Sequence, residues 1–267
     1  MTSTEETTIT TNILDRFRLD GRVAVVTGAG QGIGRGFALA LAQAGAAVSV
    51  IDWDASRAQS VAAEIQDAGG KSLAVTANLM KDDDVVRFVV ETIEHFGHLD
   101  IAVNNAGVNR NSAAEDTTLA EWDEMHNLNL RAVFRSCQEQ GRHMLARGYG
   151  KIINTASMAS LIVPHPQKQI AYNTSKAGVV SLSRTLAAEW AGRGVRVNAM
   201  SPGIIRTALI EQSEALRPLV GEWIAGIPAG KLGDVSDLQG GIVYLASGAS
   251  DYMTGHNLVI EGGQTLW

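Results

Sequence analysis

The sequence predicts an α/β domain built on one doubly wound parallel sheet of about seven strands, with helices on both faces. Short β-rich runs alternate with longer helical stretches from Arg22 to the end of the chain. Strand–helix–strand repetition of this kind is typical of right-handed βαβ units that add to one parallel sheet. The composition agrees, because 45% of the residues are apolar, only 5% are aromatic and 28 are glycine, which suits aliphatic helices packed on a buried sheet.

The strand candidates are short apolar runs without a strict alternation of apolar and polar residues. The run from Val23 to Val26 shows this clearly, as expected for a strand that is covered on both faces. Strands are expected at residues 23–27, 47–51, 72–76, 101–104, 151–154, 195–199 and 257–260. Helices are expected between them, at about 33–44, 55–68, 82–96, 118–147, 171–192 and 235–247.

The domain layout follows from the same alternation. No linker or internal repeat interrupts it, so residues 18–267 are expected to form a single domain. Residues 1–17 are expected to be a flexible tail, because the chain begins with a threonine-rich, acidic stretch that lacks an apolar run. The segment 207–231 breaks the alternation, and it is predicted to be a lid that contains one or two short helices.

Bulk properties argue against several classes of function. The net charge is −6 and basic runs are very short, so no nucleic-acid partner is expected. The sequence lacks the ~18–20 continuous apolar residues of a membrane span, and no signal peptide or membrane partner is expected. The single cysteine, Cys137, excludes an internal disulfide framework and fits a reducing, cytoplasmic location.

A glycine-rich turn follows the first strand candidate and opens the first helix. It reads Thr27-Gly28-Ala29-Gly30-Gln31-Gly32-Ile33-Gly34. Glycines let the chain turn sharply and lie close to a pyrophosphate, whose negative charge then meets the N–H groups and the positive dipole end of the helix. The turn therefore predicts a Rossmann-type dinucleotide site, and the alternative is a turn that serves only strand–helix packing.

Asp52 stands at the end of the second strand candidate, where a carboxylate can accept hydrogen bonds from both hydroxyls of the adenosine ribose. The same carboxylate would repel a 2′-phosphate by roughly 3 kcal/mol per unit of charge, at ~5 Å and an effective dielectric constant of ~20. The sequence therefore predicts NAD as the cofactor and disfavours NADP, for which Arg57 is the nearest compensating cation. The alternative role for Asp52 is to cap the helix that begins near Asp54.

Three further segments accompany the turn in a characteristic order. They are Asn104-Asn105-Ala106-Gly107 after the fourth strand candidate, Ser157 after the fifth, and Tyr172-Asn173-Thr174-Ser175-Lys176 at the start of a long helix. With the turn, these segments resemble the short-chain dehydrogenase/reductase family over residues 19–263. The resemblance implies a nicotinamide-dependent oxidoreductase that interconverts an alcohol and a carbonyl.

The tyrosine and the lysine have a chemical reason to stand four positions apart. Such positions share one face of a helix, so Tyr172 and Lys176 are expected to point into the same cleft. Lowering a phenol pKa of ~10 by about three units takes roughly 4 kcal/mol. An ammonium ~5 Å away supplies about 3 kcal/mol, and an oxidised nicotinamide adds more. Tyr172 is therefore the candidate general base, and the alternative is an ordinary pair of helical surface residues.

The resemblance assigns roles to further residues. It implies that Lys176 also binds the nicotinamide ribose, that Ser157 holds the substrate oxygen, and that Asn129 breaks a helix locally and holds a water molecule in a proton relay. Ser160 is the alternative to Ser157, and Asn127 is the alternative to Asn129. The predicted catalytic residues are Asn129, Ser157, Tyr172 and Lys176. The predicted cofactor contacts are Gly28, Gln31, Gly32, Ile33, Gly34, Asp52, Asn78, Leu79, Asn105, Ala106, Gly107, Tyr172, Lys176, Pro202, Gly203, Ile205 and Thr207.

The substrate is expected to be a polyol that is oxidised to a ketose. The loop 158–170 and the ending 262–267 are similar to those of the family's sugar-alcohol dehydrogenases. The predicted substrate contacts are Asn109, Ser157, His165 and Gln169. The alternative is a 3-oxoacyl-thioester or generic carbonyl reductase, against which Asp52 counts because biosynthetic reductases usually use NADPH.

Two other classes of protein are disfavoured. A redox-sensing module that binds NAD without turnover would typically lose the tyrosine or the lysine, and both are present here. A sugar-nucleotide epimerase would have a different glycine spacing in the turn and a larger C-terminal domain. No metal is expected, because the six histidines do not have the spacing of a zinc site, and a structural magnesium near the C-terminus is left open. The resemblance also implies a homotetramer that pairs the helices 118–147 and 171–192.

Overall fold

The computed structural model describes residues 12–214 and 216–266. Its strands are β1 (Val23–Thr27), β2 (Ala47–Asp52), β3 (Ser72–Thr76), β4 (Ile101–Asn104), β5 (Gly150–Thr155), β6 (Val195–Pro202) and β7 (Asn257–Ile260). Its α-helices are α1 (Gly32–Gln43), α2 (Ala55–Asp67), α3 (Asp82–Phe96), α4 (Leu119–His126), α5 (Ala132–Arg147), α6 (Ile170–Trp190), α7 (Ala208–Gln212), α8 (Val220–Ala225) and α9 (Val235–Ala246).

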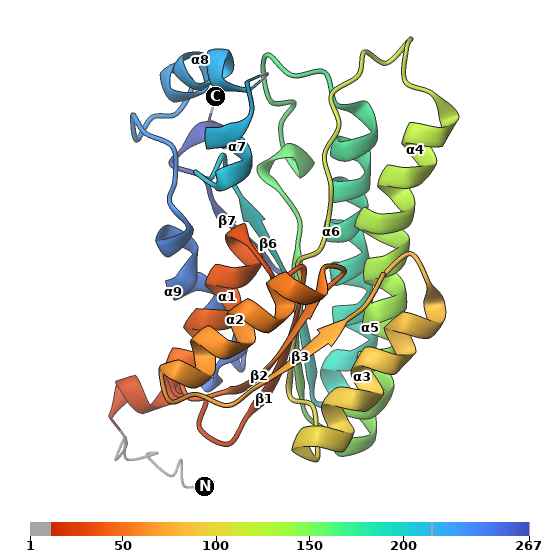
Figure 1. Ribbon diagram of the computed structural model, residues 1–267, viewed down its shortest axis with the longest axis vertical. Helices are drawn as coiled ribbons and strands as arrows, with labels where there is room; N and C mark the ends of the chain where they lie inside the picture. Colours follow the sequence, from red (N-terminus) through yellow and green to blue (C-terminus); the bar gives the residue numbers. More distant parts are fainter. Residues whose placement is uncertain (1–11, 215, 267) are drawn as a thin grey trace, which may run out of the picture.

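The strands form one parallel sheet in the order β3-β2-β1-β4-β5-β6-β7 (Figure 1). The chain first builds outward from β1 to β3, then returns to place β4 on the other side of β1. This reversal makes the sheet doubly wound, so the predicted fold class is confirmed. In such a sheet a crevice opens where the strand order reverses, at the carboxyl ends of the strands.

Helices cover both faces of the sheet. Figure 1 shows α1, α2 and α9 on one side and α3, α5 and α6 on the other. Each side has its own apolar core, one around Phe37 of α1 and the other around Phe88 of α3. All residues of β1 are buried, which explains why its sequence shows no alternation of apolar and polar residues.

The helix predicted over 118–147 is not continuous. Residues Asn127–Arg131 form a π-helical turn between α4 and α5, in which the Ala132 N–H donates to the Asn127 carbonyl. A π-helical turn accommodates one extra residue and is frequent at functional sites. The predicted break at Asn129 therefore takes the form of a local widening of the helix.

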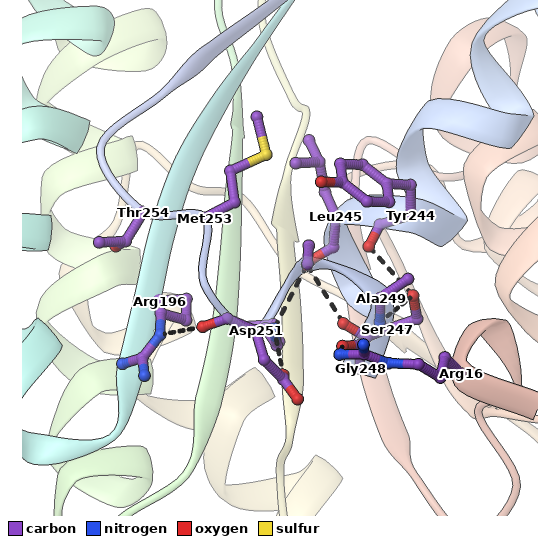
Figure 2. Close-up of polar contacts among 12 residues, drawn as sticks. Arg16, Arg196, Tyr244, Leu245, Ser247, Gly248, Ala249, Asp251, Met253 and Thr254 are labelled. Atoms are coloured by element: carbon purple, nitrogen blue, oxygen red, sulfur yellow. Dashed lines mark hydrogen bonds and ion pairs between the residues drawn. The ribbon is translucent and has the colours of Figure 1, made fainter. Parts of the chain in front are cut away.

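The N-terminal segment differs from the flexible tail expected over 1–17. Residues 1–11 lie outside the described residues, but Ile13–Phe17 form a 3-10 helix that contacts the α9–β7 loop. The Arg16 guanidinium donates to the Gly248 carbonyl at 2.6 Å (Figure 2), and the Phe17 ring lies 6.3 Å from that of Tyr244. Residues 12–17 are thus held by contacts with a segment distant in sequence, which the local sequence does not reveal.

The same loop pairs with a buried lysine at the start of β5. The Lys151 ammonium lies 2.8 Å from a carboxylate oxygen of Asp251, and it donates to the Ser250 hydroxyl at 3.3 Å. Arg196 donates to the Asp251 backbone carbonyl at 2.7 Å (Figure 2). Burial lowers the pKa of Lys151, and the Asp251 carboxylate partly offsets that effect.

The segment 207–231 contains α7, the 3-10 turn Arg217–Leu219 and α8. Three buried side chains, Trp223, Ile227 and Leu232, give it a small apolar cluster apart from the two main cores. The prediction of short helices agrees with this structure, whereas a lid movement stays a prediction. Within the described ranges, no helix combines the length and the apolar character needed to cross a lipid bilayer.

We expect Asp251→Asn to lower the free energy of unfolding by about 1–2 kcal/mol, because it leaves the buried Lys151 ammonium without its counterion. The expected loss of stability is modest because the Asp251 side chain is 58% exposed. Lys151→Met is the matched control, and it should cost less because it removes the charge that needs compensation. Urea unfolding of both variants checks this, and an Asp251→Asn variant as stable as the wild type would contradict it.

Candidate active site

The turn after β1 and the segment after β4 are joined by one side chain, Thr27. Its hydroxyl oxygen accepts hydrogen bonds from the Asn105 N–H at 3.0 Å and the Ala106 N–H at 3.2 Å. The Asn105 side-chain amide donates back to the Thr27 carbonyl at 3.2 Å. Sequence reasoning included Thr27 in the turn but did not single it out as a site residue. These bonds fix the two walls of the crevice relative to each other.

Two positions of the turn accept only glycine. Gly28 has a φ of 61°, and a Cβ there would lie 2.9 Å from the Ala106 Cα. A Cβ at Gly34 would overlap the Gly28 carbonyl oxygen. The absence of side chains thus lets the turn, α1 and the segment after β4 approach closely, as a dinucleotide site requires.

The N-terminus of α1 has free capacity for an anion. Its N-cap residue, Gln31, makes no side-chain capping bond, and the first turn contains no acidic residue. By contrast, Asp54 caps α2 and Thr118 caps α4. The first N–H groups of α1 and its positive dipole end therefore fit a pyrophosphate. The residues present fit the predicted dinucleotide.

Asp52 lies at the carboxyl end of β2 and is only 5% exposed. One carboxylate oxygen accepts from the Gly30 N–H at 2.9 Å, and the other accepts from the Asp54 N–H at 3.1 Å. Asp54, rather than Asp52, caps α2, and it also lies 3.3 Å from the Arg57 guanidinium. The capping alternative for Asp52 is therefore wrong, and its carboxylate is held at the edge of the glycine-rich turn.

The predicted tyrosine and lysine lie on the first turns of α6. The Lys176 ammonium is 5.8 Å from the centre of the Tyr172 ring and donates to the Thr155 carbonyl at 2.8 Å. A Cβ added at Gly107 would lie 3.4 Å from the Lys176 ammonium and 3.0 Å from the Asn129 amide oxygen. The loop after β4, the π-helical turn and α6 therefore converge here.

Asn129 is fully buried and uses its whole amide. Its oxygen accepts from the Val108 N–H at 2.9 Å, and its nitrogen donates to the Val108 carbonyl at 2.9 Å and to the Ser175 hydroxyl at 3.2 Å. Ser175 donates to the Tyr172 carbonyl at 2.7 Å, a link that sequence reasoning missed. The alternative residue, Asn127, is exposed. Of the two asparagines, Asn129 is therefore the one that links the loop after β4 to α6.

Ser157 follows β5 and is 8% exposed. Its hydroxyl oxygen accepts from the Ala159 N–H at 3.1 Å and caps the short 3-10 turn Met158–Ser160. The hydroxyl of Ser160, the alternative, donates to the Ser157 carbonyl at 2.7 Å. The Ser160 hydrogen is thus already committed to the backbone, whereas Ser157 also interacts with Tyr172.

Burial shifts the pKa values of Tyr172 and Lys176 in opposite directions. Burial raises the pKa of Tyr172, and a hydrogen bond with Ser157 lowers it only in part. Burial also lowers the pKa of Lys176 to about 8. Desolvation is thus the largest influence on both groups, and the expected lowering of the Tyr172 pKa by Lys176 together with an oxidised nicotinamide stays a prediction.

The remaining cofactor candidates fall into two groups. Asn78 and Leu79 follow β3, where the Asn78 N–H donates to Asp84 at 2.8 Å and its side-chain oxygen accepts from the Met80 N–H at 3.0 Å. The second group is Pro202, Gly203, Ile205 and Thr207, which follow one another at the end of β6. Thr207 faces the turn, since a Cβ at Gly32 would lie 3.7 Å from its methyl group. Of this group, Thr207 therefore lies against the glycine-rich turn.

The substrate candidates do not all meet. The Asn109 amide donates to the Gln169 side-chain oxygen at 2.9 Å, and Gln169 is buried directly before α6. The side chain of His165, in contrast, is 83% exposed and lies 2.8 Å from a carboxylate oxygen of Glu222 on α8. Its own contact is therefore with the segment 207–231, a pairing that the local sequence could not reveal.

A buried polar network supports the ends of β4 and β5. The Asn104 amide donates to the Asn154 side-chain oxygen at 2.9 Å and receives a bond from the Gln140 amide at 2.9 Å. Asn154 in turn donates to the Ser183 hydroxyl at 3.0 Å. Cys137 borders this network, and burial raises the pKa of its thiol to about 12. The network connects both strand ends to α5 and α6. It adjoins Thr155, whose carbonyl accepts the hydrogen bond from Lys176.

Comparison with known proteins agrees with this arrangement over nearly the whole chain. The family described as "Enoyl-(Acyl carrier protein) reductase" matches residues 28–265. A 2-dehydro-3-deoxy-D-gluconate 5-dehydrogenase from Escherichia coli is 40% identical, over 94% of this chain and 98% of its own length. A D-threitol dehydrogenase from Mycolicibacterium smegmatis is 37% identical, over 94% and 95% respectively. The crystal structure of a short-chain type dehydrogenase/reductase from Mycobacterium marinum is 42% identical, with a TM-score of 0.92 over 95% of this chain and 99% of that one.

The chain therefore belongs to the short-chain dehydrogenase/reductase family, whose members here are oxidoreductases named for the CH–OH compounds on which they act. Its similar relatives include dehydrogenases named for neutral polyols and others named for sugar acids. Both NAD-dependent and NADP-dependent enzymes occur among them.

We expect Asn129→Ala to lower the free energy of unfolding by about 2–4 kcal/mol, because it leaves the buried Val108 backbone groups and Ser175 without a partner. Asn127→Ala, an exposed position in the same π-helical turn, is the matched control and should change it by less than about 0.5 kcal/mol. Chemical denaturation compares the two. Equal stability of both variants would show that the Asn129 hydrogen bonds do not hold the site together.

Proposed function

We propose that this protein is an NAD-dependent oxidoreductase that interconverts a secondary alcohol and a ketone, with a polyol and its ketose as the reacting pair. The observation that carries the proposal is the convergence of Lys176 and Asn129 at Gly107, with the Tyr172 ring centre 5.8 Å from the Lys176 ammonium. This cluster adjoins the crevice where the N-terminus of α1 has no capping side chain. A proton-transfer group thus lies beside a site that fits a dinucleotide.

Each residue has a distinct part in the proposed reaction. Tyr172 removes the hydroxyl proton of the alcohol and returns it in the reverse direction, as a general base and acid. Ser157 donates a hydrogen bond to the same substrate oxygen and stabilises its developing negative charge. Lys176 donates one of its three N–H groups to the Thr155 carbonyl, so two remain for the ribose hydroxyls of the cofactor. Asn129 positions the loop after β4 against α6.

The pH dependence follows from the direction of the Tyr172 shift. Because burial raises the pKa of Tyr172, its phenol is protonated at neutral pH and is a proton donor rather than a base. When bound, oxidised NAD supplies the hydride acceptor and a positive charge that favours the phenolate. Alcohol oxidation should therefore speed up as pH rises, whereas carbonyl reduction should slow down.

We expect Tyr172→Phe to reduce kcat by about 10²–10⁴-fold, because the proton-transfer group is lost. NADH binding, followed by fluorescence titration, should change by less than about threefold. Tyr149→Phe is the matched control, since Tyr149 lies under the Arg22 guanidinium at the other end of the strands and should leave kcat unchanged. Wild-type kcat in Tyr172→Phe from pH 6 to 10 would refute the proposed role.

The preference for NAD rests on Asp52. Its carboxylate is nearly buried and fixed by two backbone N–H groups beside the turn, so it cannot swing away from a 2′-phosphate without losing those bonds. Arg57, the nearest compensating cation, is already paired with Asp54. A fixed negative charge at this edge favours the ribose with two free hydroxyls.

We expect Asp52→Asn to shift the ratio of kcat/KM for NAD to that for NADP by about 100-fold towards NADP, which corresponds to roughly 3 kcal/mol of removed repulsion. Asp67→Asn removes an exposed carboxylate at the other end of α2 and is the matched control, for which the ratio should stay within threefold. Steady-state kinetics with both cofactors distinguishes them. A similar shift in both variants would mean that general charge, rather than Asp52, sets the preference.

The polyol assignment is supported by the paired Asn109 and Gln169 amides before α6 and by relatives named for polyols. Gln169 is buried, although Asn109 is exposed. A buried polar group favours a hydroxylated substrate, because a ligand without hydroxyls leaves it unpaired. The alternative, a 3-oxoacyl-thioester or generic carbonyl reductase, fits the reductase description of the matching family. We also propose a homotetramer that pairs α6 with its copy in another subunit. The exposed side of α6, where such pairing would occur, carries a hollow of about 760 Å³.

Turnover tests the substrate class directly. With NAD, we expect tetritols, pentitols or hexitols to be oxidised at least ten times more efficiently than hydrophobic secondary alcohols of similar size. A spectrophotometric panel of both kinds of alcohol, run with NAD and NADP, measures this. Turnover of hydrophobic alcohols or 3-oxoacyl thioesters without any polyol would overturn the polyol assignment and favour the alternative.

A further inference from the structure

The segment 207–231 connects the two sides of the candidate site. At its start, the Thr207 methyl group lies 3.7 Å from the position of a Cβ on Gly32, in the glycine-rich turn. Farther along, Glu222 of α8 contacts His165 at 2.8 Å, on the loop that leads to Tyr172. Figure 1 shows α7 and α8 beside this loop, at one end of the molecule. Glu222 therefore stands where the segment meets the substrate side.

The position of Glu222 is set by its neighbour. Trp223 is 2% exposed and anchors α8 in the small apolar cluster with Ile227 and Leu232. The Glu222 side chain is about half exposed and contacts His165 instead of this cluster. Packing thus holds the carboxylate at the loop, although no arginine or lysine attracts it there.

Acidic and basic residues are mixed at this end of the molecule. In the segment 207–231 the acidic residues are Glu211, Glu214 and Glu222, and the basic residues are Arg217 and Lys231. Three cations are paired with carboxylates: Lys231 lies 3.5 Å from Asp237, Arg206 lies 3.7 Å from Asp234, and Arg110 lies 2.7 Å from Glu124. Arg217 and Lys168, by contrast, belong to no ion pair among the described residues. The imidazole beside Glu222 is charged only when protonated, so it is a weaker counterion than a guanidinium.

We propose that Glu222 is a specificity-determining residue that disfavours carboxylated sugars and thereby selects neutral polyols. This inference rests on the proposed function, and it separates the two substrate classes that the names of the relatives offer. The carboxylate repels a second carboxylate that approaches between α8 and the loop before Tyr172. A neutral polyol of the same shape meets no such repulsion and can accept or donate hydrogen bonds at this place.

Inhibition by a matched pair of ligands tests the inference. Gluconate and glucitol have similar carbon chains, but the first carries a carboxylate where the second carries a hydroxymethyl group. Their inhibition constants are measured against any alcohol that the wild type oxidises. In Glu222→Gln we expect the constant for gluconate to fall about fivefold at low ionic strength, while that for glucitol changes less than twofold. The difference should shrink in 0.5 M salt, where charges are screened over a few ångströms.

Glu211→Gln, in α7 of the same segment, is the matched control and should leave both constants within twofold. Equal changes for the two ligands in Glu222→Gln would indicate loosening of the segment and would overturn the inference. An equal effect of Glu211→Gln, or wild-type oxidation of gluconate in preference to glucitol, would also overturn it. Absence of polyol turnover in the wild type would instead refute the proposed function, because the inhibition constants still report on Glu222.

Discussion

The buried amide of Asn129 is the constraint on which the rest of the candidate site depends. It satisfies both backbone groups of Val108 and one hydroxyl of α6, so it links the loop after β4, the π-helical turn and α6. Without the extra residue of the π-helical turn, the helix would present a different side chain at this depth. The close approach of Gly107 to Lys176 follows from this link, and Thr27 connects the same loop to the glycine-rich turn. One side chain thus aligns the residues for proton transfer with the residues for dinucleotide binding.

Burial gives this alignment an electrostatic consequence. The surroundings of Tyr172 and Lys176 disfavour the charged form of each group, so the pKa of the phenol is raised and that of the amine is lowered. In such a poorly solvated place, an added charge has a larger effect on a neighbouring proton than it would have in water. The site can therefore keep the tyrosine neutral on its own and still respond strongly to the charge state of a bound dinucleotide.

Much of this arrangement could be predicted from the sequence, because the motifs follow directly after strands. In a parallel sheet, such positions meet at one edge, which is why the glycine-rich turn, Asn105 and Ser157 could be expected to lie in one region. The features that the sequence could not predict depend on partners far apart in the chain. The contact of His165 with Glu222, the attachment of Arg16 to Gly248 and the raised pKa of Tyr172 all arise from tertiary packing and desolvation. The linking bond through Ser175 was missed because a serine three residues after a tyrosine has no distinctive pattern.

The small apolar cluster around Trp223 has an implication for how this architecture diversifies. Its members contact one another rather than the two large cores, so mutations there leave the sheet and its helices largely undisturbed. Evolution, or a protein engineer, can therefore replace the segment 207–231 as a unit. The candidate catalytic and dinucleotide-binding residues would then stay the same, while substrate specificity differs from one descendant to the next.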